Sequence, residues 1–213
     1  MTRSLFLAVA AMALAGAAYA QDPAQAGVAQ TGATQVDAKT IDDWRAVDLG
    51  AGVGVDVPRA VGEAYRPPDK ADAGLLLFRV AARDAGEMYC GLDRLGFNAP
   101  PLGMARTRAI DFLTNAAPAI FCHGVGTGVR ESFAEVAKSG QGYPGSRCVA
   151  SYTDVQGGKS EGDVIHARVV VGNDAVYVLM CTVRDLDQAR AELDWETIWR
   201  PRITHVEDSL KLP

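Results

Sequence analysis

The sequence predicts an α+β fold, in which helices pack on a mostly antiparallel sheet as an α/β/α sandwich. Three runs rich in β-branched and aromatic residues follow one another between residues 147 and 183 with short polar connectors, which is typical of an antiparallel meander. Helical periodicity occurs before this region and again after it, so strands and helices do not alternate as in βα repeats.

The first 20 residues have the three parts of a cleavable secretory signal peptide. Arg3 supplies a positive charge, an uncharged apolar run covers residues 5–17, and Ala18-Tyr19-Ala20 is an A-x-A cleavage motif. The run is shorter than the roughly 20 residues that cross a bilayer. We therefore expect a periplasmic or secreted protein that begins at Gln21 and has no membrane span after cleavage.

Residues 21–40 are rich in Ala, Gln and Thr and contain no aromatic residue. Such a segment buries too little apolar surface to offset its chain entropy, so we predict a flexible linker. The remaining residues 41–213 are enough for a single α+β domain with one core.

The charge balance bears on the kind of partner. The chain has 21 Lys and Arg against 26 Asp and Glu, a net charge of -5, and its basic residues are scattered. This pattern gives no electrostatic footprint for nucleic acid or an anionic membrane. We expect the partner to be an envelope protein or a small ligand, and no nucleic acid.

The first half of the domain combines short strands with one helix. Strands are predicted at residues 44–48, 53–58, 75–82 and 88–92, the second of them alternating Val with Gly54 and Asp56. A helix is predicted between Pro100-Pro101 and Pro118, because Ile110, Leu113 and Ala117 recur at helical spacing.

Residues 129–137 fit two structures. Ser132 and Glu135 have the spacing of a helix capping box, whereas Phe133 to Ala137 alternates like a strand. We favour the strand.

The meander consists of RCVASYTDV, VIHARVVV and AVYVLMCTV, and Gly172-Asn173-Asp174 forms the turn of its second hairpin. After it, Asp185 is expected to cap a helix that ends at Pro201. A last helical segment then places Ile203, Val206 and Leu210 on one face.

The connector of the first hairpin, QGGKSEGD at residues 156–163, matches two catalytic motifs. It contains G-x-S-x-G around Ser160 and the last residues of a P-loop. Both motifs require a helix after the turn, whereas here a strand enters and another strand leaves. We therefore predict a hairpin turn.

Four cysteines, Cys90, Cys122, Cys148 and Cys181, form an even set without C-x-x-C spacing, which in an exported chain favours two disulfides. Cys148 and Cys181 would lie two strands apart, about 10 Å, beyond the roughly 7 Å Cα limit of a disulfide. Two connectivities remain, and of these we favour Cys122–Cys148 with Cys90–Cys181.

The histidines are His123, His166 and His205, and none has the spacing of a metal or catalytic motif. We expect no catalytic residue, metal or cofactor. The alternative is an envelope hydrolase or thiol enzyme that uses Cys122 and His123, or Ser160.

Trp195 and Trp199 are four residues apart on the late helix, a spacing typical of core packing. In the alternative, an exposed Trp199 beside Arg200 and Arg202 binds a partner, since Trp and Arg are frequent in interface hot spots.

The layout resembles the PsbP-like fold of photosystem II extrinsic subunits and of small bacterial envelope proteins. The shared features are an early strand ending at Pro58, one helix after the first strands, a late meander, and a terminal helix ending VEDSLKLP, together covering about residues 41–213. The four cysteines and the glycines of residues 124–128 depart from it. The resemblance implies an α/β/α sandwich and a non-catalytic binding or assembly role, and it identifies no site residue.

Overall fold

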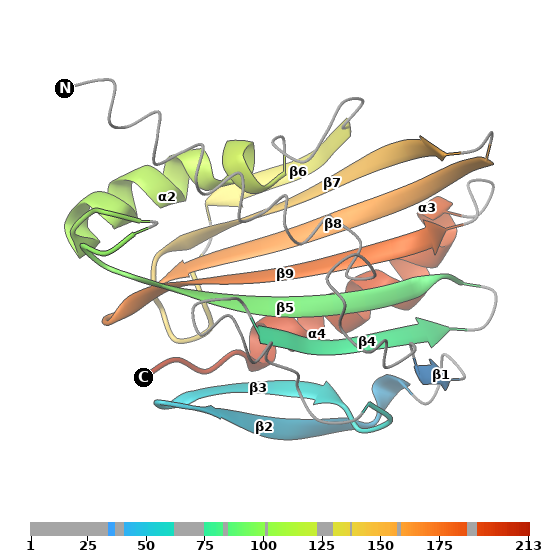
Figure 1. Ribbon diagram of the computed structural model, residues 1–213, viewed down its shortest axis with the longest axis horizontal. Coiled ribbons are helices and arrows are strands. Elements are labelled where there is room, and N and C mark those ends of the chain that lie inside the picture. The colour runs from blue at the N-terminus through green and yellow to red at the C-terminus, as the bar shows by residue number, and fades with distance from the viewer. Residues whose placement is uncertain are drawn as a thin grey trace.

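A computed structural model describes residues 34–36, 41–61, 75–82, 85–100, 102–122, 130–136, 138–156, 159–186 and 191–213. A seven-stranded sheet has the order β1-β4-β5-β9-β8-β7-β6 (Figure 1). Its strands are β1 (Thr34–Val36), β4 (Leu75–Ala82), β5 (Glu87–Gly96), β6 (Arg130–Val136), β7 (Gly145–Gln156), β8 (Lys159–Val171) and β9 (Ala175–Leu186).

The remaining elements flank this sheet. A separate two-stranded hairpin consists of β2 (Trp44–Gly50) and β3 (Val53–Pro58). The helices are α2 (Arg106–Phe121), α3 (Ala191–Asp194), the π-helical turn η3 (Trp195–Trp199) and α4 (Arg200–Ser209). All strand pairs except β1–β4 are antiparallel, which confirms the predicted α+β class.

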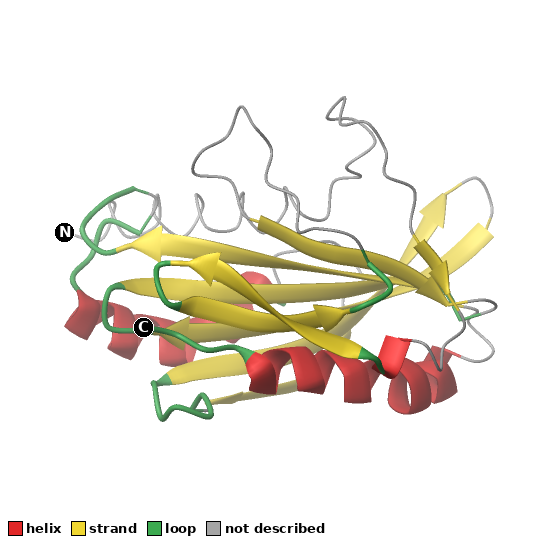
Figure 2. Cartoon of the chain, turned by 90° about the horizontal axis from the view of Figure 1, so that it is seen from below, coloured by secondary structure: helices red, strands yellow, loops and turns green. Residues whose placement is uncertain are grey.

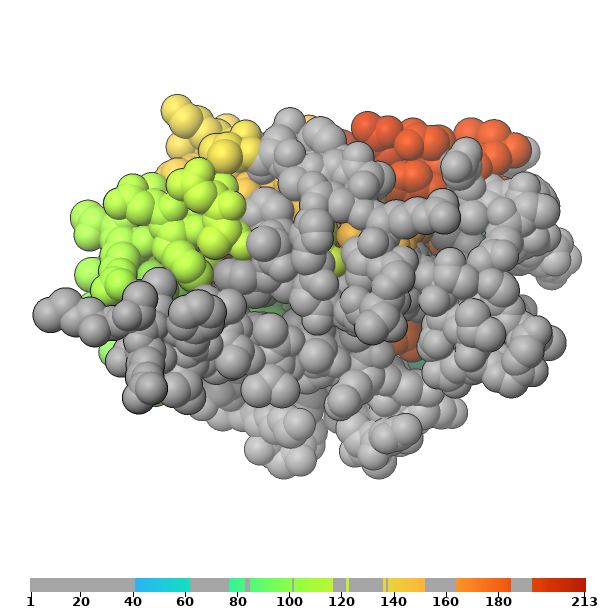
Figure 3. Space-filling model, turned by 90° about the horizontal axis from the view of Figure 1, so that it is seen from above, coloured from blue at the N-terminus to red at the C-terminus, as the bar shows by residue number. Residues whose placement is uncertain are grey.

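Helices cover both faces of the large sheet, as the predicted α/β/α sandwich requires. Along β9, Val176 and Val178 belong to the core cluster beneath α2, whereas Tyr177 and Leu179 belong to the cluster that contains α4 residues. This alternation puts α2 and α4 on opposite faces, because successive side chains of a strand point in opposite directions. Figure 1 shows α4 behind β4 and β5, and Figure 3 shows the outer side of α2 at the surface.

The meander is confirmed: β7, β8 and β9 are neighbours in sequence order. In the second hairpin, the Gly172 N–H donates to the Ala175 carbonyl over 2.9 Å, so the turn lies where Gly172-Asn173-Asp174 predicts it. Residues 130–136 form β6, which decides the ambiguous segment in favour of the strand.

In the first hairpin the strands are longer than predicted. Gln156 pairs with Lys159, and Ser160 lies within β8 opposite Val155. Only Gly157 and Gly158 remain between the strands, and they lie outside the described residues. Since a strand follows the motif, the context of a nucleophile elbow or a P-loop is lacking, as expected.

Two helix boundaries differ from prediction. Helix α2 continues past Pro118 to Phe121. A proline within a helix removes one backbone hydrogen bond, here to the Thr114 carbonyl. Packing of α2 on β7 and β8, and the disulfide at Cys122 directly after it, hold the last turn in place.

The second difference concerns the C-terminal helix. Asp185 is not a helix cap, because β9 continues to Leu186, which pairs with Gly162 of β8. Helical structure runs from Ala191 through the π-helical turn to Ser209, so it does not end at Pro201, which directly follows that turn at the start of α4.

At the N-terminal side, Thr34–Val36 of the segment predicted as a linker pair in parallel with Val80–Ala82 of β4. Three residues of that segment therefore belong to the sheet. The rest of residues 1–40 lies outside the described residues, as does the expected signal peptide. Among the described helices, none has the length and apolar character to span a membrane.

Gly145, the first residue of β7, tests how tightly the meander is packed. A Cβ atom there would overlap the backbone carbonyl oxygen of Val169. Because a backbone atom cannot rotate away, we expect Gly145→Ala to lower the free energy of unfolding by about 1–3 kcal/mol. Urea denaturation measures this. Gly140→Ala is the matched control, since nothing lies within 4 Å of its added Cβ, and an equal loss in both variants would contradict the prediction.

Candidate binding site

The β2–β3 hairpin has one face in the core and one face toward solvent. Val53, Val55 and Val57 of β3 are buried in the core, so the alternating Gly54 and Asp56 point outward. The turn between the strands is built from Gly50, Ala51 and Gly52, all with positive φ. The hairpin lies next to α4 and the C-terminal tail, which we define as residues 210–213 (Figure 2).

The C-terminal tail extends the hairpin by one more segment. Gly54 and Lys211 form an antiparallel bridge, in which the Gly54 N–H donates to the Lys211 carbonyl over 3.0 Å and the Lys211 N–H donates back over 2.8 Å. The Asp56 N–H donates to Ser209 Oγ over 2.9 Å. Three segments, β2, β3 and the tail, therefore lie side by side.

The outer surface formed by β2, β3 and the tail contains an open hollow of about 360 Å³. It is lined by Ala46, Val47, Asp48, Gly52, Val53, Gly54, Val55, Asp56, Ser209 and Lys211. Ala46 and Gly54 leave space for this hollow because neither has a large side chain. Asp48 Oδ1 accepts a hydrogen bond from the Gly50 N–H at 2.8 Å. Within the described part of the chain, neither Asp48 nor Lys211 has an ion-pair partner.

One side of the hollow is fixed by contacts between the hairpin and α4. His205 stacks on Trp44 with 4.3 Å between ring centroids, and its Nε2 lies 3.1 Å from Asp56 Oδ2. Arg202 of α4 pairs with Asp42 at 2.9 Å. The Asp56 carboxylate is thus already engaged, which leaves Asp48 as the available carboxylate of the hollow.

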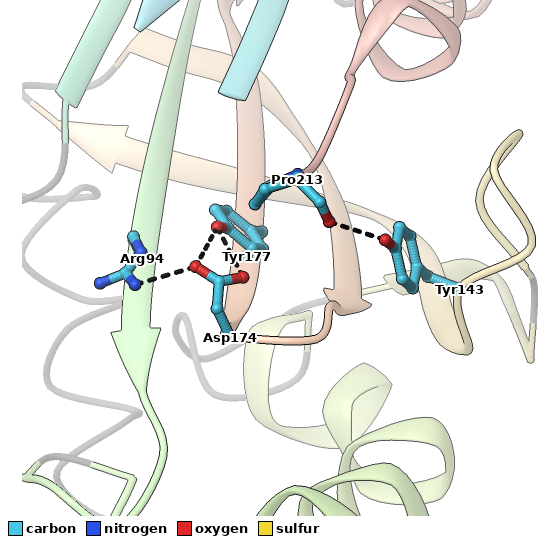
Figure 4. Close-up of polar contacts among 5 residues, drawn as sticks. All are labelled: Arg94, Tyr143, Asp174, Tyr177 and Pro213. Carbon is cyan, nitrogen blue, oxygen red and sulfur yellow. Dashed lines mark hydrogen bonds and ion pairs between the residues drawn. The ribbon is translucent and has the colours of Figure 1, made fainter. Parts of the chain in front are cut away.

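The tail itself is held from the opposite side. Gln141 exchanges two hydrogen bonds with the Leu212 backbone, at 3.0 and 2.7 Å. The Tyr143 hydroxyl donates to the Pro213 carbonyl oxygen over 2.7 Å (Figure 4). These bonds fix the position of Lys211 one residue away.

Figure 4 also shows a polar cluster at the neighbouring β8–β9 turn, where Asp174 binds Arg94 at 2.9 Å and the Tyr177 hydroxyl at 3.0 Å. Burial by itself would raise the pKa of Asp174, but the hydrogen bonds from Arg94 and Tyr177 outweigh it and lower this pKa. With Asp174 ionised, this cluster stabilises the β8–β9 turn.

A second group of titratable residues lies between β8 and α4. His166 is 5% exposed, its Nε2 is 3.5 Å from Glu207 Oε1, and Trp195 contacts its ring edge-on. Burial, followed by the charges of Arg147, Arg168 and Arg200, lowers the pKa of His166 to about 3. The imidazole is therefore neutral near pH 7 and belongs to the packing of α4 on the sheet.

The four cysteines are joined as Cys90–Cys181 and Cys122–Cys148, the pairing favoured from the sequence. Cys148 and Cys181 lie on β7 and β9 with β8 between them, which is the strand order that excluded their pairing. Cys90 and Cys181 are directly opposite each other on β5 and β9, whereas Cys122 connects the end of α2 to β7.

Of the proposed catalytic residues, Cys122 has no free thiol, because its sulfur is in a disulfide. His123 lies outside the described residues, and Ser160 is a strand residue whose side chain is not described. In the part of the chain that the structure describes, no group of three or more His, Cys, Asp or Glu side chains could hold a metal ion.

The suggested partner-binding residues do not form one exposed surface. Trp199 is fully buried and its Nε1 donates to the Ala85 carbonyl over 2.7 Å, so it does not meet the condition of an exposed anchor. Arg202 is buried against Asp42, while Arg200 is exposed and paired with Glu196. The apolar spacing of Trp195 and Trp199 reflects core packing.

Trp199 offers a test of this packing. We expect Trp199→Phe to lower the free energy of unfolding by about 1–3 kcal/mol, because the buried Ala85 carbonyl loses its hydrogen-bond donor. Chemical denaturation measures the change, and Trp195→Phe, at a half-buried position, is the control. A smaller loss for Trp199→Phe than for the control would contradict the prediction.

No protein-family model matches the chain, and no curated protein matches it. Among solved structures, the chain is similar to the Ran-binding protein Mog1p of Saccharomyces cerevisiae, with 12% identity and a TM-score of 0.44 over 79% of this chain and 94% of that one. It is also similar to LpqN, involved in cell envelope biogenesis of Mycobacterium tuberculosis, with 16% identity and a TM-score of 0.38 over 81% and 80% of the two chains.

A third similar structure is the protein of unknown function PA94 from Pseudomonas aeruginosa, a putative regulator, with 12% identity and a TM-score of 0.37 over 75% and 93% of the chains. Similarities at this level concern the fold alone.

The hollow was not predicted from the sequence. Its residues come from three segments, and Lys211 lies more than 150 positions after Asp48. The only local signal was the alternation in VGVDVP, which puts Gly54 and Asp56 on the face opposite the valines.

Proposed function

We propose that the chain is an exported, non-catalytic binding or assembly module of the cell envelope. The observation that carries this proposal is that all four cysteines are paired in two disulfides and that all four are buried. Disulfides persist in oxidising compartments such as the periplasm, which agrees with the signal-like sequence of residues 1–20.

Two observations favour binding over the alternative of a thiol enzyme or hydrolase. The Cys122 sulfur is bonded to Cys148, so it cannot act as a nucleophile while the disulfide is intact. Ser160 lies in a strand that follows another strand, which is not the turn that exposes a nucleophilic serine. The exposed face of the hairpin, by contrast, offers a preformed surface hollow.

Export can be tested by mass spectrometry of the protein from a periplasmic fraction. We expect a chain that begins at Gln21 and reacts with a thiol reagent only after reduction. A chain that retains residues 1–20, or that shows free thiols when native, would contradict export.

Binding can be tested by photo-crosslinking in intact cells. A photoreactive residue at Ala46, in the hollow, should give a discrete crosslinked product, whereas one at Arg108 on the exposed side of α2 should not. Identical patterns at both positions would contradict a binding role for the hairpin surface.

A further inference from the structure

Two opposite charges face each other across the hollow without pairing. Asp48 of β2 is opposite Gly54 of β3, and Gly54 is in turn bridged to Lys211 of the tail. Residues directly opposite in antiparallel pairs have side chains on the same face, so Asp48 and Lys211 point to the same side. The backbones of Asp48 and Lys211 are separated by two strand spacings, which is about 10 Å.

Gly54 keeps the space between these charges open. Next to this row, Ala46 is opposite Asp56, whose N–H donates to Ser209 Oγ at the end of α4, so two of the three neighbouring side chains are small. Asp56 is engaged with His205. The hollow therefore presents one available carboxylate and one available ammonium group on opposite walls.

Both charged residues have fixed backbones. The Asp48 side chain accepts a hydrogen bond from the Gly50 N–H of the turn. The Lys211 backbone is held by its two hydrogen bonds with Gly54 and by the two hydrogen bonds between Gln141 and the adjacent Leu212. A direct Asp48–Lys211 pair across the hollow would be exposed to solvent, and such pairs contribute only about 0–1 kcal/mol. Little stability is therefore lost when both groups pair with a ligand instead of with each other.

We propose that this hollow binds a small zwitterionic ligand, with its ammonium group at Asp48 and its carboxylate at Lys211. Because the two walls have opposite charges, a molecule with both an ammonium group and a carboxylate should bind more tightly than a molecule with only one of them. The inference rests on the proposed binding role and specifies its ligand class.

The test is a titration of the ¹⁵N-labelled protein, followed by ¹H–¹⁵N correlation spectra, with ω-amino acids from glycine to 6-aminohexanoate. We expect saturable shifts of the Gly52, Gly54 and Lys211 amides for at least one chain length. Butylamine and butyrate, which carry one charge each, should bind about 2- to 5-fold more weakly, the value of one exposed ion pair.

Variants locate the site. Asp48→Asn and Lys211→Gln should each weaken binding about 2- to 5-fold. Gly54→Ala should abolish the shifts while leaving the fold intact, because its Cβ would fill the floor and meet only the Val47 carbonyl oxygen, at 3.5 Å. Arg59→Gln is the control, since its ion pair with Asp43 lies outside the lining of the hollow.

Equal shifts with the singly charged compounds, or unchanged affinity in Asp48→Asn and Lys211→Gln, would overturn the proposal. Binding only to phosphatidylethanolamine vesicles, and not to the free ω-amino acids, would also overturn it, because the ligand would then be a lipid surface. If crosslinking at Ala46 succeeds while every ω-amino acid fails, the ligand class is wrong and the binding role stands.

Discussion

Replacing Cys90 and Cys181 together by alanine should lower the free energy of unfolding by about 4–5 kcal/mol in the chain-entropy model. The bond joins residues 91 positions apart, so its loss restores a large number of conformations to the unfolded chain. Cys122→Ala with Cys148→Ala should cost less, about 3–4 kcal/mol, because that separation is 26.

Urea denaturation of both double variants, beside the oxidised and the reduced wild type, measures these losses. Reduction of the wild type should destabilise it at least as much as either double variant. An unchanged midpoint in both double variants would show that the disulfides do not constrain the unfolded chain. Peptide mapping of unreduced protein provides the control for connectivity, and a Cys148–Cys181 peptide would contradict the strand order.

Acidification should destabilise the protein through His166, and His166→Gln should remove this part of the pH dependence. The pKa of His166 is lowered to about 3 in the folded state, against about 6.5 when unfolded. Between these two pH values the unfolded state binds the proton and the folded state does not. The free energy of unfolding therefore decreases by about 1.4 kcal/mol for each unit by which the pH is lowered. From pH 6.5 to 4.5 this single group contributes a loss of about 2–3 kcal/mol.

The measurement is the free energy of unfolding of wild type and His166→Gln at pH 6.5, 5.5 and 4.5. The wild type should lose more stability than the variant over this range, since only the wild type has a buried imidazole that binds a proton on unfolding. His205→Gln is the matched control for the loss of an imidazole, because His205 is 42% exposed whereas His166 is 5% exposed. Parallel curves for wild type and His166→Gln would show that burial does not hold His166 neutral.

Local sequence patterns predicted most strands correctly. The alternation of VGVDVP, the apolar run of β4 and the β-branched runs of the meander each determine a strand, because side-chain periodicity is a property of a few adjacent residues. The strand order within the meander follows from its short turns. That order was enough to exclude a Cys148–Cys181 bond.

Element ends were decided by tertiary contacts. Pro118 and Pro201 look like helix ends in sequence, yet α2 continues because it packs on β7 and β8, and Pro201 lies in the first turn of α4. Asp185 looks like a cap, but pairing of β9 with β8 extends the strand beyond it. Propensities of about 1 kcal/mol per residue, and of about 3 kcal/mol for a proline within a helix, are overridden when a longer strand pairing or a packed helix face is available.

By itself the sequence determined the fold class, the two surviving disulfide connectivities and the expectation of export. Only the tertiary structure buried Trp199, made His166 an internal residue, and brought Asp48, Gly54 and Lys211 into one row. The physical reason is that burial and cross-strand register depend on which distant segments meet. A bridge between β3 and the C-terminal tail joins residues more than 150 positions apart, and no local periodicity encodes it.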